Sequence, residues 1–196
     1  VEHDLVVFAD EIHQDLLFPG HRHVPFASLG DEVARRTVTF TSATKSWNLA
    51  GLCCAVAHFG PDPLLATIDA FPPHYLGRIS IAGIETTAAA WREGDPWLLE
   101  LLAYLDGNRA RLASFVRDRL SGIDHVAPEA TFLAWLDCRA LDLPGGPFSY
   151  FLERALVAVS DGSDFGEAGR GFVRLNFATP RAILDQVLER MAAALR

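Results

Sequence analysis

Apolar residues near the start of the chain form short continuous runs of the kind that fill buried strands. Residues 5–9 are five apolar residues rich in β-formers, and they end at Asp10. Such a run is typical of a parallel strand that is buried on both faces. Residues 37–41 and 54–59 are two further candidate strands. Because parallel strands need neighbours joined by crossovers, we expect further strands upstream, in a longer protein of which this chain is the C-terminal part.

After Pro61 the apolar residues recur at helical spacing. Residues 63–71 and 81–91 are expected to be helical, and a long amphipathic helix is expected over 96–120. A smaller α+β arrangement is expected to follow, with its elements in the order strand 132–136, helix 148–156, strand 171–177, helix 181–195.

Residues that favour helix starts or loops separate these elements. Thr179 and Pro180 predict the start of the last helix, with Thr179 as the capping residue and Pro180 in the first helical position. The stretches 143–147 and 162–171 are rich in glycine or proline and predict loops, and we expect mobility in the second.

Composition excludes several classes of protein. Hydrophobic residues make up 50% of the chain and charged residues 21%, as in packed globular proteins and unlike disordered ones. The net charge of −8 disfavours nucleic-acid binding, and no apolar run reaches the roughly 18–20 residues of a membrane span. Cys53, Cys54 and Cys138 lack zinc-type spacing, so we expect no metal and a reducing cytoplasm.

The distribution of basic residues is unusual. Of the 17 lysine and arginine residues, only Lys45 is a lysine. Arginine can replace lysine on a solvated surface, but it cannot lose its proton near neutral pH and so cannot act as an amine nucleophile. Lys45 is therefore either a chance survivor of biased composition or a residue retained for its amine.

Two short motifs fit a helicase as well as an enzyme of another class. Residues 10–13 (DEIH) follow a strand, and residues 42–44 (SAT) follow the next one, at an interval that resembles DExH-box helicases. A P-loop and a downstream pair of phosphate-binding arginines are not found in the sequence, and the acidic balance opposes a nucleic-acid groove. The helicase interpretation is therefore disfavoured.

Residues 42–52 (SATKSWNLAGL) resemble the lysine segment of fold-type I enzymes that depend on pyridoxal 5′-phosphate (PLP). That pattern has a serine three residues before the lysine, an aromatic residue two after it, and then a glycine. Asp10 matches the family's aspartate that pairs with the pyridine nitrogen. Residues 171–176 (GFVRLN) resemble the strand that carries the arginine for the substrate carboxylate, which places Arg174 in that role.

Further segments of the sequence resemble one branch of the class I and II aminotransferases, the cystathionine β-lyase-like (C–S lyase) branch. The similar segments are 10–13, 20–23, 25–29 and 128–137. The resemblance implies an α/β fold in two parts. Residues 1–90 would be the C-terminal part of a large PLP-binding domain with a mostly parallel sheet, and 91–196 a linking helix and a small α+β domain.

The resemblance also assigns roles. Lys45 would hold PLP as a Schiff base and later act as general base at the substrate Cα, which requires an uncharged amine and favours a buried position. Asp10, in a buried crevice at the end of a parallel strand, would keep the pyridine nitrogen protonated. Ser42 would bind the cofactor phosphate, His13 the PLP 3′-oxygen, and Arg174 the substrate carboxylate in a bidentate clamp.

Each of these residues can also have a purely structural role. Asp10 can be a solvated loop acid or a helix cap, Ser42 a turn serine, and His13 a packed histidine. His21 and His23 lack the further ligands of a zinc site and are interpreted as loop residues, possible neighbours of the substrate entrance. Cys53 stands eight residues after the lysine, where many aminotransferases have an arginine for the cofactor phosphate.

The function implied by the resemblance is a PLP-dependent C–S β-lyase acting on cystathionine or a similar L-cysteine S-conjugate. The alternatives are a PLP-dependent aminotransferase for a small L-amino acid and a non-catalytic or regulatory protein of the same fold. We expect a cytoplasmic homodimer in the full-length protein, with no nucleic acid, membrane or metal partner. The 196 residues alone are expected to be inactive and at best to bind PLP weakly, because the phosphate loop and stacking aromatic residue would lie upstream.

Overall fold

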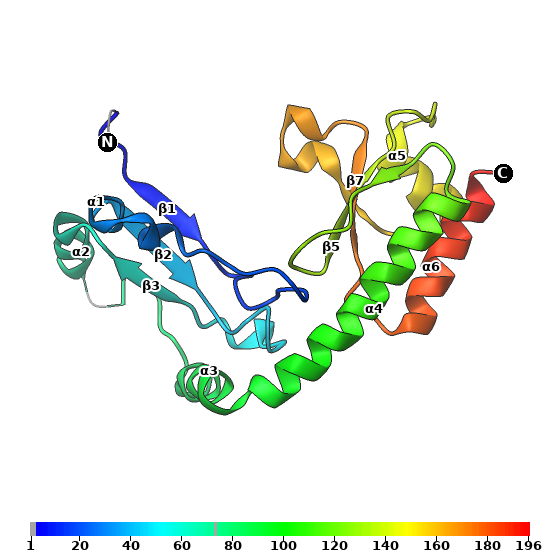
Figure 1. Cartoon of the computed structure of the whole chain (residues 1–196). Coiled ribbons are helices and arrows are strands. Elements are labelled where there is room, and N and C mark those ends of the chain that lie inside the picture. Colours follow the sequence, from blue (N-terminus) through cyan, green and yellow to red (C-terminus); the bar gives the residue numbers. More distant parts are fainter. Residues whose placement is uncertain (1–2, 73) are drawn as a thin grey trace. The chain divides into compact units, whose positions relative to one another are not determined.

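The structure, a computed structural model, describes residues 3–72 and 74–196 of the chain. It divides into two compact units, Val1–Leu101 and Leu102–Arg196, each with its own sheet (Figure 1). The division falls inside a long helix. The sequence predicts two parts, 1–90 and 91–196, and the boundary between them lies before that helix.

The first unit is built on a three-stranded sheet in which two neighbouring strands are parallel. The strands are β1 (Val7–Asp10), β2 (Thr37–Thr41) and β3 (Val56–Phe59), in that order across the sheet. β1 runs parallel to β2, with Asp10 opposite Phe40, and β3 runs antiparallel to β2. All three strands lie within two residues of the predicted ranges.

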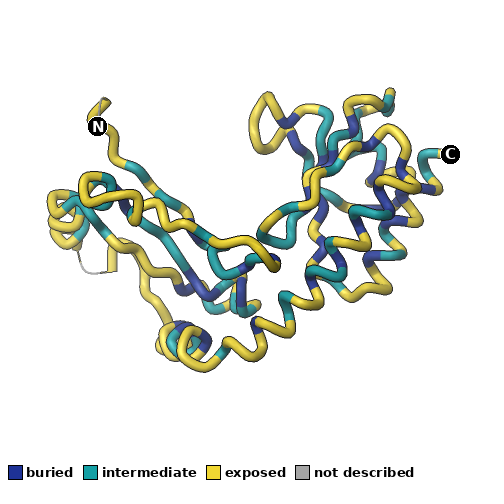
Figure 2. Tube along the Cα trace, in the orientation of Figure 1, coloured by how far each residue is buried: buried dark blue, intermediate teal, exposed yellow. Residues whose placement is uncertain are grey.

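The first strand is not buried on both faces as its apolar run predicts. Phe8 is 66% exposed and Val6 44% exposed, whereas Val38 of the central strand is fully buried (Figure 2). The prediction is wrong within the described residues, because none of the β1 residues is buried; β1 also has a hydrogen-bonded neighbour on one side only among them.

Helices of the first unit begin at residues that favour helix starts. α2 (Asp62–Asp69) has a proline in its first turn. Ser80 caps α3 (Ile81–Glu93) by accepting a hydrogen bond from the Gly83 amide at 2.9 Å. α4 (Asp95–Arg119) follows directly, and three single turns complete the unit: η1 (Phe26–Leu29), α1 (Asp31–Ala34) and η2 (Ala50–Leu52). No helix in the described ranges is long and apolar enough to cross a membrane.

The second unit contains a four-stranded antiparallel sheet with one buried face. Across the sheet the strands are β4 (Asp124–His125), β5 (Leu133–Asp137), β7 (Phe172–Asn176) and β6 (Ser160–Asp161). Alternate residues of the two central strands, Ala134, Leu136, Val173 and Leu175, are at most 3% exposed. The opposite face carries Trp135 and Arg174, which lie opposite each other in the register.

Helices supply the rest of this core. α4 contributes Leu105 and Leu112, and α6 (Arg181–Ala194) contributes Leu184 and Leu188, all nearly or fully buried. Ion pairs between the two helices join Arg111 to Asp185 at 2.8 Å and Arg119 to Glu189 at 3.1 Å. The predicted helix over 148–156 is two shorter elements, α5 (Gly146–Tyr150) and a π-helical turn η3 (Phe151–Ala155).

Two predicted boundaries of this unit differ from the structure. The stretch 162–171 is not an open loop, since it folds into 3-10 turns η4 (Gly162–Phe165) and η5 (Glu167–Gly169), in which Gly162 and Gly169 are buried. Thr179 does not cap α6. Pro180 occupies the N-cap position, and the Arg181 amide donates to the Tyr104 hydroxyl at 2.7 Å, so a side chain of α4 satisfies the helix start instead.

Asn108 is a fully buried polar residue of α4 whose side-chain amide makes three hydrogen bonds. Its Nδ2 donates to the carbonyl oxygens of Phe177 and Thr179, both at 2.9 Å. Its Oδ1 accepts from Arg181 Nε at 2.8 Å. Asn108 therefore ties α4 to the connection between β7 and α6.

Replacing Asn108 by alanine should lower the free energy of unfolding by about 1–3 kcal/mol, because buried carbonyls lose their donor. Urea unfolding followed by circular dichroism measures the change. Arg117→Ala is the control, since it removes an exposed ion pair to Asp118 and should cost less than about 1 kcal/mol. Equal effects of the two substitutions would contradict this role of Asn108.

Candidate functional site

The candidate site lies where the two parallel strands of the first unit end. Asp10 is the last residue of β1, and Lys45 lies four residues beyond Thr41, the last residue of β2. The carboxyl ends of neighbouring parallel strands meet at one edge of a sheet, where open α/β proteins bind ligands. Both candidate residues therefore follow the same sheet edge.

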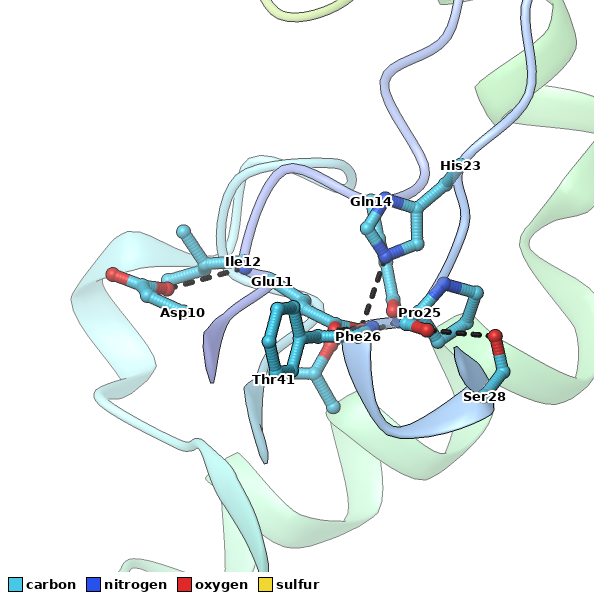
Figure 3. Close-up of polar contacts among 9 residues, drawn as sticks. All are labelled: Asp10, Glu11, Ile12, Gln14, His23, Pro25, Phe26, Ser28 and Thr41. Atoms are coloured by element: carbon cyan, nitrogen blue, oxygen red, sulfur yellow. Dashed lines mark hydrogen bonds and ion pairs between the residues drawn. The ribbon is translucent and has the colours of Figure 1, made fainter. Parts of the chain in front are cut away.

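Asp10 is held by a local turn, and its second carboxylate oxygen has no hydrogen bond to residues 3–72 and 74–196. Its Oδ1 accepts a hydrogen bond from the Ile12 amide at 3.2 Å (Figure 3). The side chain is exposed, so the expectation of a buried crevice is wrong within this chain.

Lys45 lies on a tight turn that presents its amine outwards. Backbone hydrogen bonds of 3.0 Å join Trp47 N to Ala43 O and Leu49 N to Thr44 O, which closes the turn around the lysine. The Lys45 side chain is exposed and has no ion pair or hydrogen bond within residues 3–72 and 74–196. The predicted burial of Lys45 is therefore not found, but the amine is uncommitted.

Ser42 is fully buried and engaged within the chain. Its Oγ lies 2.5 Å from both the Cys54 carbonyl oxygen and Thr44 Oγ1, and it accepts from the Thr44 amide at 3.0 Å. The single hydroxyl proton is thus directed at a partner inside the protein. Phosphate binding by Ser42 stays a prediction, and it would require the hydroxyl to exchange one of these partners.

The remaining predicted residues lie as follows. His13 is partly buried in the turn after β1, where its carbonyl accepts from the Leu16 amide at 3.0 Å. Arg174 is in the second unit, on β7, and is partly buried. The predicted roles of both residues remain predictions.

Glu11 is a buried carboxylate that the sequence analysis did not single out. It is 7% exposed, its Oε1 accepts from the Phe26 amide at 2.8 Å, and its Oε2 lies 3.0 Å from His23 Nε2 (Figure 3). Gln14 Nε2 donates to Thr41 Oγ1 at 2.9 Å. His23 lies in a loop, as predicted, and its ring pairs with Glu11 and so anchors the segment before η1. Its place near a substrate entrance stays a prediction.

Two more contacts hold the lysine turn. The Trp47 indole nitrogen donates to the Gly94 carbonyl oxygen at 3.0 Å. Ser46, fully buried, donates to Asp15 Oδ2 at 3.4 Å. Partial burial raises the pKa of Asp15 above the ordinary aspartate value. The two residues that follow Lys45 are thus both anchored, while the lysine itself is not.

Cys53 ends the single turn η2 in a left-handed backbone conformation, with φ of +48°. Its side chain is exposed, and all three cysteines are free thiols. Within the described ranges no cluster of three or more histidine, cysteine, aspartate or glutamate side chains is arranged to hold a metal ion. Asp10 and Lys45 place one carboxylate and one amine after the ends of the parallel strands.

A primary amine and a carboxylate presented together at the ends of parallel strands define a candidate site for an amine-linked cofactor in an α/β protein. The chain matches the model of the aminotransferase class I and II family over residues 1–191. It therefore belongs to that family.

Relatives in this family are similar across the whole chain. Cystathionine beta-lyase PatB of Bacillus subtilis is 36% identical over 198 residues, which cover 100% of this chain and 51% of PatB. The structure titled OvoB is 42% identical with a TM-score of 0.92, covering 99% of this chain and 50% of that one. The PLP-bound C-S lyase of Staphylococcus hominis is 31% identical with a TM-score of 0.89, covering 99% and 51%.

Aminotransferases are more distant relatives. The aspartate aminotransferase of Pyrococcus abyssi is 29% identical over 198 residues, covering 100% of this chain and 50% of that protein. The chain spans about half the length of the curated relatives it matches. These likenesses confirm the predicted α/β fold of PLP-dependent transferases and the predicted branch of the family.

Glu11→Ala should lower the free energy of unfolding by about 1–3 kcal/mol, because the Phe26 amide and the His23 ring lose their buried acceptor. Glu32→Ala is the control, since Glu32 forms an exposed ion pair with Arg36 and should matter by less than about 1 kcal/mol. Denaturant unfolding at neutral pH compares the two variants. If Glu11→Ala is as stable as Glu32→Ala, Glu11 does not anchor this segment.

Proposed function

We propose that this chain provides the lysine-bearing part of a PLP-dependent C–S β-lyase that acts on cystathionine or a similar L-cysteine S-conjugate. The observation that carries the proposal is the position of the chain's single lysine, uncommitted on a turn at the sheet edge that also carries Asp10. Relatives named cystathionine beta-lyase support the reaction type.

The residues present fit PLP in two respects. Lys45 offers a primary amine that can hold an aldehyde cofactor covalently, and no partner within the described ranges competes for it. Asp10 has one oxygen occupied by the Ile12 amide and can offer the other to a protonated pyridine nitrogen. When bound, PLP supplies an electron sink for negative charge developing at the substrate Cα.

Different side chains of this chain would then carry out the separate steps of binding and catalysis. Asp10 would keep the cofactor nitrogen protonated, since a nearby carboxylate favours the positive charge. Lys45, once displaced from the cofactor by the substrate amine, would accept the Cα proton. Arg174 would bind the substrate carboxylate through two parallel hydrogen bonds. His13 and Ser42 would contact the cofactor oxygen and phosphate.

Elimination follows from the loss of that proton. Transfer of the Cα proton to Lys45 would allow a Cα–Cβ double bond to form as the Cβ–S bond breaks, and the leaving thiolate would take up a proton. One water molecule would then be consumed in converting the remaining three-carbon fragment to pyruvate and ammonia. A cysteine S-conjugate meets this need because sulfur at Cβ is a good leaving group.

Transamination of a small L-amino acid is the second candidate. It uses the same lysine, aspartate and arginine and differs in what leaves after the Cα proton is lost: the substrate would leave as a keto acid without its amino group, and no Cβ–S bond would break. The greater distance of aminotransferases among the relatives favours elimination. A non-catalytic protein of the same fold is the third candidate, and the free Lys45 amine argues against it.

We further propose a cytoplasmic homodimer. Three free thiols fit a reducing compartment. The exposed apolar residues Leu5, Val6 and Phe8 of the first unit fit a surface that other polypeptide covers. The 196 residues alone should be catalytically inert, because Asp10 and Lys45 are exposed here and lack the water-excluding surroundings that such chemistry needs.

The reaction is tested on the protein expressed from its entire coding sequence and supplied with PLP. Incubation with L-cystathionine and no keto acid should release pyruvate, ammonia and a thiol in equal amounts. Lys45→Arg, which keeps the charge but cannot lose its proton, should abolish the release, whereas Arg78→Lys on an exposed segment should not. Amino transfer to an added keto acid without pyruvate from cystathionine would establish the aminotransferase instead.

A further inference from the structure

Two arginines lie on the open face of the second unit's sheet, and they differ in how their charge is satisfied. Arg139 forms a double contact with Asp137, at 2.9 Å through Nε and 2.7 Å through an NH₂ group. Arg174 donates only to Ser160 Oγ, at a long 3.4 Å, and pairs with no carboxylate in residues 3–72 and 74–196. Arg174 therefore keeps donors available for an incoming anion.

An aromatic ring takes the place of the missing carboxylate. The Cζ atom of Arg174 lies 4.4 Å from the centroid of the Phe165 ring, well inside the range of cation–π attraction. A carboxylate would hold the guanidinium by consuming its N–H donors and neutralising its charge. A ring face attracts the cation while leaving both the donors and the net charge in place.

Trp135 supports the Phe165 ring. The two rings meet edge to face, with centroids 5.6 Å apart and planes at 81°. Trp135 lies opposite Arg174 in the strand register and stacks on Phe172 at 5.5 Å on its other side. The Phe165 ring is thus fixed from the same sheet that carries Arg174, although it belongs to the turn η4.

Glycines bring that turn onto the sheet. A Cβ atom at Gly162 would collide with the carbonyl oxygens of Gly169 and Phe172, so only glycine permits this close approach of η4 to β7. Gly166, directly after Phe165, has φ of +111° and turns the chain away. The Asp161 side chain caps the turn by accepting from the Ser163 amide at 3.0 Å.

We propose that Phe165 is a positioning residue for Arg174. Its ring holds the guanidinium in one orientation without occupying the N–H donors. The substrate carboxylate can then bind to an arginine that is already ordered. The proposal rests on the proposed function in taking Arg174 as the carboxylate ligand. Pre-ordering reduces the entropy lost when the substrate binds, so its removal should affect KM more than kcat.

The test uses the protein expressed from its entire coding sequence, with PLP and L-cystathionine as substrate. Phe165→Leu, which keeps an apolar side chain but removes the ring, should raise KM about two- to fivefold with little change in kcat. Phe165→Tyr restores a ring face and should behave as the wild type. Phe115→Leu is the control, because it removes a ring that lies under Arg111 and Arg119, whose charges Asp185 and Glu189 already satisfy, and it should leave KM unchanged.

A second readout does not depend on turnover. In ¹H–¹⁵N spectra, the Arg174 side-chain signal, assigned by its loss in Arg174→Lys, should carry a ring-current shift that disappears in Phe165→Leu and persists in Phe115→Leu. A signal at the same position in Phe165→Leu and the wild type would show that the ring does not hold the guanidinium, and would overturn the proposal.

The kinetic outcomes distinguish a failure of the positioning role of Phe165 from a failure of the proposed function. If KM rises in Arg174→Lys but not in Phe165→Leu, Arg174 binds substrate without help from Phe165 and the positioning role is wrong. If KM is unchanged in Arg174→Lys, Arg174 is not the carboxylate ligand and the positioning role is wrong. If the wild type does not convert cystathionine, the proposed function fails, and the ring-current shift then tests the positioning of Arg174 without it.

Discussion

Parallel pairing of β1 with β2 is the constraint on which the candidate site depends. It sets Asp10 opposite Phe40, so that both strands end at one edge and the chain continues from there into the turn that carries Lys45. Antiparallel pairing of the same strands would send the carboxylate and the amine to opposite edges. Since β1 is paired on one side only in the described chain, its pairing with β2 alone places Asp10.

Around this edge, the neighbours of Asp10 and Lys45 are anchored, whereas the Lys45 amine has no hydrogen bond or ion pair to residues 3–72 and 74–196. Glu11 binds the Phe26 amide next to Asp10, and Trp47 binds the Gly94 carbonyl two residues from Lys45. These contacts hold the local backbone without using the carboxylate or the amine. Arg174 in the second unit is held in a similar way. Its neighbours Val173 and Leu175 are buried, and its guanidinium lies over the Phe165 ring.

Much of this arrangement is predictable from local patterns. Apolar runs and helical spacing place the strands of the first unit within two residues, because such periods reflect which side chains must be covered. Lys45 stands out because no other lysine exists in the chain. Burial is less predictable: the pattern shows where β1 ends, but not what covers Phe8, Asp10 or Lys45, and all three are exposed.

The contacts that shape the site could not be found from spacing alone. Glu11 meets His23 across 12 positions, and Asn108 meets Phe177 across 69, so neither pairing leaves a local signature. Phe165 lies in a glycine-rich stretch that predicts mobility. Its position over Arg174 depends on Gly162, a glycine required by tertiary contact rather than by a turn. Polar partners and ring stacks of this kind follow from the fold and become visible only with it.

The most direct test of the central claim is to locate the lysine that binds the cofactor. The protein, expressed from its entire coding sequence and incubated with PLP, is reduced with borohydride, digested, and mapped by mass spectrometry. The account predicts a single reduced cofactor adduct on the peptide that contains Lys45. An adduct confined to another amine, such as the N-terminus, or no adduct at all would contradict it.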